Sequence, residues 1–146
     1  AWWLISEADK RKEEKKQKAM MYSSRIQDGS EAIDSNENTN PEMIKNIKKM
    51  YIDAANQNNV LVIPVGIAFE NAYDFNPDIV LHKDYDGSHP SLLGTYLAAC
   101  VVFSSITHKS PLKIQYDYFG KITQEEKKFL QEVAKNTVEN FYRIKL

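Results

Sequence analysis

Val60-Leu61-Val62-Ile63-Pro64-Val65 is the stretch of sequence that decides the fold. It is a continuous apolar run rich in β-branched residues, which is typical of a strand covered on both faces, as in a parallel sheet. Pro64 cannot donate a ladder hydrogen bond, so we expect it to mark the end of the strand. With helices before and after this strand, the chain is predicted to be an α/β protein.

Helix signals precede the strand. Asn40 is a good N-cap, and Pro41 suits the first helical position, where its missing N–H would have had no helical partner. Apolar residues then recur at three- and four-residue spacing from Met43 to Ala54, which predicts a helix with one apolar face.

Further helices are expected after the strand. The stretch 66–75 predicts a loop and a short helix, and 91–108 predicts a largely buried helix. The segment 109–122 is irregular and aromatic. Thr123 and Glu126 have the spacing of a capping box, so they predict the start of a last helix within 123–146.

The beginning of the chain has a different character. Residues 2–5 are aromatic and branched, which predicts a short strand, and Trp2 and Trp3 are expected in the core. The charge run 7–18 predicts a solvated helix, and 27–40 predicts a loop, so we expect 6–40 to be a polar excursion. The apolar start without Met favours a single, truncated domain over 1–146 whose N-terminal portion is missing.

Composition narrows the class of protein. The 146 residues suit one domain, and a content of 42% hydrophobic and 27% charged residues is globular. A net charge of −1 argues against nucleic acid as a partner, and no apolar run reaches the roughly 18 residues of a membrane span. The single cysteine, Cys100, excludes an internal disulfide and is expected in the core.

The candidate catalytic residues lie in the stretch Asp86-Gly87-Ser88-His89-Pro90-Ser91, just before the expected buried helix. A carboxylate three residues before an imidazole, in a turn, can form the base half of a nucleophilic triad. Pro90 disfavours the α region for His89 and holds it extended or in a turn, where it can project into a cleft. Asp86 could then bond one ring nitrogen and leave the other facing a hydroxyl.

Spacing alone leaves other interpretations of this motif open. Asp86 could simply cap a turn while His89 packs locally, and Asp84 is a rival as the orienting carboxylate. The nucleophile is not identified. Ser30 follows Asp28 and Gly29 in a polar loop with no preceding strand, and Ser88 is too close to His89 to be its attacking partner.

No metal or other cofactor is expected. The residues that could be combined into a metal site lack the spacing of a zinc site, and one of them lies at a helix C-terminus, where a cation is favoured by the dipole. These residues are His82, Asp84, Asp86, His89 and His108.

The motif resembles the last block of the SGNH (GDSL-type) hydrolase family. The resemblance rests on Asp86 to Ser91 followed by Gly94-Thr95-Tyr96-Leu97-Ala98-Ala99-Cys100 and by Lys109-Ser110-Pro111, with Ile63-Pro64-Val65-Gly66 upstream. It covers residues 41–111. It implies a partial α/β/α sandwich with a parallel sheet, and ester hydrolysis without a cofactor.

The same resemblance implies the site and its partners. Asp86 and His89 would be two members of the catalytic triad. That family takes its serine from an early Gly-Asp-Ser block that is not recognisable here, so a missing N-terminal half or a complementing chain would supply it. The implied substrate is a small ester, such as an acylated carbohydrate, and the implied location is secreted or periplasmic in a bacterium.

Two functions of different class follow. In the first, the parent protein is a serine esterase, with His89 as general base and acid and Asp86 as its orienting carboxylate. In the second, the chain is a non-catalytic α/β module, or an inactive fragment, that retains the Asp-x-x-His motif as a remnant.

Overall fold

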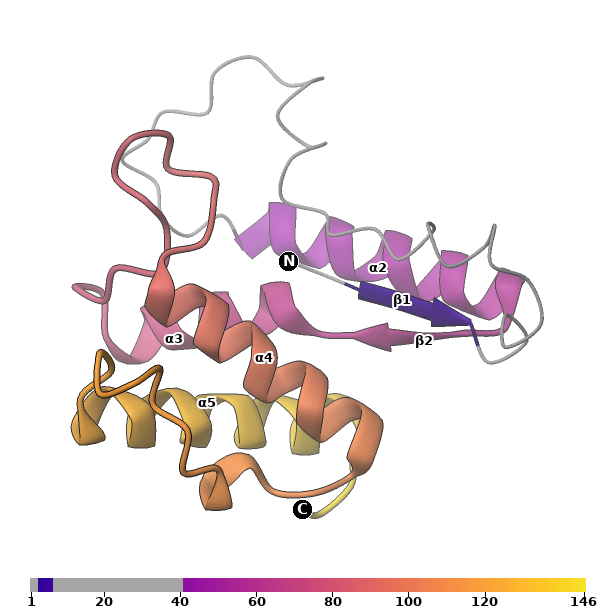
Figure 1. The fold of residues 1–146 in the computed structure, drawn as a ribbon. Helices are drawn as coiled ribbons and strands as arrows, with labels where there is room; N and C mark the ends of the chain where they lie inside the picture. The colour runs from indigo at the N-terminus through magenta and orange to yellow at the C-terminus, as the bar shows by residue number, and fades with distance from the viewer. Residues whose placement is uncertain (1–2, 7–40) are drawn as a thin grey trace.

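The computed structural model describes residues 3–6 and 41–146, and this part of the chain is mostly helical (Figure 1). Its elements, in chain order, are β1 (Trp3–Ser6), α2 (Pro41–Asn58), β2 (Val60–Ile63), α3 (Val65–Phe75), α4 (Leu92–Thr107), the 3-10 turn η2 (Pro111–Lys113) and α5 (Gln124–Tyr142). The predicted helix at 7–18 and the predicted loop at 27–40, with Ser30, lie outside the described residues, as does Trp2.

The predicted α/β/α sandwich with a parallel sheet is wrong. Within the described residues, β2 pairs with β1 alone, and the two run antiparallel, with Trp3 opposite Ile63 and Ser6 opposite Val60. The strand at 60–63 and its end before Pro64 were predicted correctly. The strand direction and the size of the sheet were not predicted correctly. A continuous apolar run indicates that both faces of a strand are buried, but it does not indicate which elements cover or pair with that strand.

Helices, rather than a larger sheet, bury both faces of β2. Figure 1 shows α2 on one side of the strand pair and α4 and α5 on the other. Val62 is buried against Tyr51 and Ala55 of α2. Ile63, the next residue, is fully buried in the main core that α3, α4 and α5 build. Successive strand residues thus enter two different apolar clusters.

The main core lies between α4 and α5, which pack side by side. Leu97 and Val101 of α4 are fully buried, as are Leu130, Ala134 and Val138 of α5. Both sets recur every four residues, so each forms one apolar stripe on its helix. Among the described helices, none is long and apolar enough to cross a membrane.

Helix ends follow the local signals in the sequence. The helix predicted after Asn40 begins at Pro41, and the capping box of Thr123 and Glu126 is present at the start of α5. The helix predicted at 91–108 is α4, with Ser91 as its N-cap. The loop expected at Gly66 is absent, because α3 begins at Val65, directly after Pro64.

Candidate functional site

The loop between α3 and α4 carries the Asp-x-x-His motif, and hydrogen bonds close its base. His82 and Pro90 form an isolated antiparallel bridge, and the Lys83 amide donates to the His89 carbonyl at 2.8 Å. The Gly87 amide donates back to the Lys83 carbonyl at 2.9 Å. Gly87 has φ +61°, in the left-handed region that favours glycine, so the residue type matches the turn.

Ser91 ties this loop to α4. Its amide donates to the Leu81 carbonyl at 2.8 Å, and its hydroxyl donates to the Val80 carbonyl at 2.7 Å. The same hydroxyl accepts from the Gly94 amide at 3.1 Å and so caps the helix. Gly94 allows this close packing, because a Cβ there would lie 2.1 Å from the Leu81 carbonyl oxygen.

Asp86 and His89 form the predicted pair. Asp86 Oδ2 hydrogen-bonds His89 Nδ1, and Asp86 Oδ1 accepts from the amides of Ser88 and His89, each at 3.0 Å. The Ser88 amide, followed by the amide and the ring of His89, lowers the pKa of Asp86 to about 2. The orienting contact is made by Asp86 and not by its rival Asp84.

The ionised carboxylate fixes the tautomer of the neutral ring. A carboxylate without a proton can only accept, so Nδ1 of His89 carries the proton and Nε2 is left as an acceptor. This is the tautomer that a general base requires.

His89 stands at the surface of the loop. Its side chain is 66% exposed, against 27% for Asp86. The ring of Tyr85 stacks on the imidazole at a centroid distance of 6.3 Å, and Lys83 Nζ lies 5.5 Å from the Tyr85 ring centre. The expected projection into a cleft is therefore not seen for this side chain, which faces solvent with an aromatic ring on one side.

The described residues do not identify the nucleophile. Within 3–6 and 41–146, no hydroxyl hydrogen-bonds Nε2 of His89. The contact of Ser88 with the pair is through its backbone amide, which donates to Asp86.

His82 and His108 do not join the hydrogen-bonded pair of Asp86 and His89. The Tyr73 hydroxyl lies 2.7 Å from His82 Nδ1, the Phe69 ring packs at 5.2 Å, and burial lowers the pKa of His82. His108 ends α4 in the left-handed conformation. In the described part of the chain, no three metal-ligating side chains come together. The contact between Tyr73 and His82 has no signature in the sequence.

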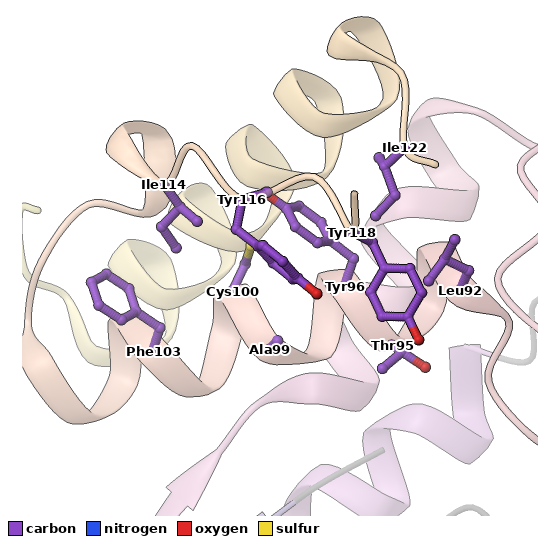
Figure 2. Close-up of a pocket in the computed structure, with 10 residues that line it drawn as sticks. All are labelled: Leu92, Thr95, Tyr96, Ala99, Cys100, Phe103, Ile114, Tyr116, Tyr118 and Ile122. Carbon is purple, nitrogen blue, oxygen red and sulfur yellow. The ribbon is translucent and has the colours of Figure 1, made fainter. Parts of the chain in front are cut away.

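A second feature, which the sequence did not predict, is an apolar cavity of about 340 Å³ beside α4. Figure 2 shows its walls, which are one face of α4 and the segment 114–122. The aromatic residues of that segment were noticeable in the sequence, but the hollow beneath them was not.

Comparison with known proteins adds no relative. No family model matches this chain, and no curated protein or solved structure matches it. The resemblance to the SGNH hydrolases therefore depends on the motif residues quoted above.

Proposed function

We propose that this chain supplies the Asp/His pair of a serine-dependent carboxylic ester hydrolase, with His89 as general base and Asp86 as its orienting carboxylate. The observation that supports it is the hydrogen bond that His89 Nδ1 donates to Asp86, with the carboxylate held by two backbone amides and Nε2 left open. The function does not need a parallel sheet, because Ser-His-Asp groups recur on unrelated folds.

In this proposal each group has one role. Nε2 of His89 takes the proton of a serine hydroxyl as the serine oxygen bonds to the ester carbonyl carbon. The imidazolium that results is stabilised by the Asp86 carboxylate, which stays ionised because its pKa is about 2. Nε2 then gives the proton to the departing alcohol, and water releases the acid by the same steps.

The serine and the substrate come from the resemblance rather than from the geometry. The serine belongs to residues outside the described part of the protein or to a second chain. The substrate class is a small acyl ester, with an acylated carbohydrate as the first to test.

The rival function is a non-catalytic module with a remnant motif. One observation favours it: Asp86 Oδ1 accepts two backbone amides, so the carboxylate also shapes the turn. If Asp86 had only this structural role, the motif would be retained in a protein that has no serine hydroxyl for His89 to activate.

The test uses the protein from its complete reading frame, including any residues before Ala1. We expect labelling by a fluorophosphonate and turnover of p-nitrophenyl acetate. His89→Ala should lower kcat by roughly 10³-fold or more, the range for loss of a positioned general base. Asp86→Asn keeps an oxygen for the two amides and removes the anionic acceptor of Nδ1, so it should lower kcat while the circular dichroism spectrum is unchanged.

His108→Ala is the matched control, because it removes an exposed imidazole at the end of α4. It should leave turnover unchanged. Normal turnover in His89→Ala, or an intact protein that neither reacts with the fluorophosphonate nor hydrolyses esters, would contradict the proposed function and favour the remnant.

A further inference from the structure

The cavity beside α4 has two facing walls. Thr95, Ala99 and Phe103 lie on one face of α4, at the spacing of successive helical turns. Ile114, Tyr116 and Tyr118 face them from the segment after η2, as Figure 2 shows. The volume of about 340 Å³ falls within the range of roughly 300–1,000 Å³ that small-molecule sites occupy.

A hydrogen-bond network behind the apolar lining joins the two walls of the cavity. Gln131, 3% exposed, donates through Nε2 to the Tyr96 hydroxyl and to the Ile114 carbonyl, both at 2.9 Å. The Tyr96 hydroxyl in turn donates to the Tyr116 carbonyl at 3.1 Å. Gln131 Nε2 and the Tyr96 hydroxyl therefore already have hydrogen-bond partners and do not require a polar ligand.

The lining carries no charge. None of the ten lining residues is Asp, Glu, Lys, Arg or His. Burial raises the pKa of Cys100 and of Tyr96, each to about 12, so both side chains are neutral near pH 7. An ionised ligand would lose its hydration there without gaining a partner.

The outer wall is held in a strained conformation. Tyr118, Phe119 and Gly120 have φ of 56°, 59° and 74°, so two bulky residues occupy the left-handed region in succession. This conformation is unfavourable for residues that carry a Cβ atom. The Gly120 amide donates to Asp117 Oδ1 at 2.8 Å and helps to hold the turn. Strain of this kind, at the edge of a cavity, is characteristic of binding sites.

We infer that this cavity binds a small, neutral, apolar molecule that carries a flat ring. The two-walled shape, the uncharged lining and the strained aromatic turn support this assignment together. The site is independent of the Asp86–His89 pair, and it stands whether or not that pair is catalytic.

The test uses two fluorescent probes that share a ring system. N-phenyl-naphthylamine is neutral, and anilinonaphthalene sulfonate is its anionic counterpart. Fluorescence titration of the full chain should show one site for the neutral probe and at least tenfold weaker binding of the sulfonate. Ala99→Phe, which fills the cavity from α4, should weaken binding of the neutral probe at least tenfold, and the smaller Ala99→Leu by an intermediate factor.

Phe75→Ala is the control for adsorption to exposed aromatic rings. Phe75 ends α3, is 71% exposed and does not line the cavity, so its removal should change the affinity less than twofold. The inference is overturned if the wild type binds no probe, if both Ala99 variants bind like the wild type, or if Phe75→Ala alone removes binding. It is also overturned if sedimentation shows a dimer that binds the probe only on dilution, since a second copy would then occupy the cavity.

Discussion

Gly94→Ala should destabilise the protein, although the substitution adds a single methyl group to a helix. Gly94 lies in the first turn of α4, where the helix passes directly over the base of the motif loop. An ideal Cβ at this position would lie 2.1 Å from the Leu81 carbonyl oxygen and 3.0 Å from Cζ of Phe69. The ring can move, but the carbonyl belongs to the backbone and cannot rotate away.

Two opposing effects set the magnitude. Replacing glycine by alanine inside a helix stabilises it by at most about 1 kcal/mol. Overpacking costs roughly 1–3 kcal/mol, and a clash with backbone belongs at the upper end of that range. The net loss should therefore be about 2 kcal/mol, which lowers Tm by roughly 4–8 °C in a domain of this size.

Thermal unfolding followed by circular dichroism measures the loss. Thr95→Ala is the control, because it introduces the same residue at the next position of the same helix, and it should stay within about 0.5 kcal/mol of the wild type. Amide hydrogen exchange gives a local reading: a displaced Leu81 carbonyl weakens its bond to the Ser91 amide, so that amide should exchange faster in Gly94→Ala.

A Gly94→Ala protein that melts at or above the wild-type Tm, with the Ser91 amide still protected, would refute the reasoning. It would mean that α4 and the Leu81 backbone can separate at no cost. The geometry that presents Asp86 and His89 would then not depend on this contact.

The Asp86 carboxyl should titrate near pH 2 in the folded protein, since the amides of Ser88 and His89 stabilise its charged form. Its pKa is lower folded than unfolded, so its contribution to stability is complete above about pH 4 and is lost as the pH falls toward 2; a carboxyl resonance that titrates near 4 would contradict this. Ser104→Ala should leave stability unchanged or raise it by up to about 1 kcal/mol. The Ser104 hydroxyl is fully buried and has no hydrogen-bond partner among the described residues, and alanine is the better helix former. A loss of more than 1 kcal/mol in urea unfolding would show that the hydroxyl has a role.

The Asp86–His89 contact could be predicted because it is local. Gly87 permits the left-handed turn, Pro90 keeps His89 extended, and His89 follows Asp86 by only three positions. The same holds for the start of α5, where Thr123 and Glu126 cap the helix within one turn. In each case the partners lie in a short stretch whose backbone geometry the residue types determine.

The fold class could not be predicted in the same way. The run from Val60 to Ile63 correctly indicated a strand buried on two faces, but α2 on one face and the α3–α5 core on the other produce the same pattern as a parallel sheet. The cavity escaped prediction for a related reason. Gln131 hydrogen-bonds Tyr96 and Ile114, which lie in segments far from it in the chain. No local sequence pattern indicates these contacts.

The antiparallel pairing of β1 with β2 has a consequence for the order of folding. Ser6 meets Val60 only after the whole segment 7–59 has closed into a loop, whereas α3, α4 and α5 follow one another closely along the chain. Closing a loop of that length costs conformational entropy before the contacts between the two strands can stabilise the protein. The helical core is thus expected to assemble first, as a template onto which the first strand docks last.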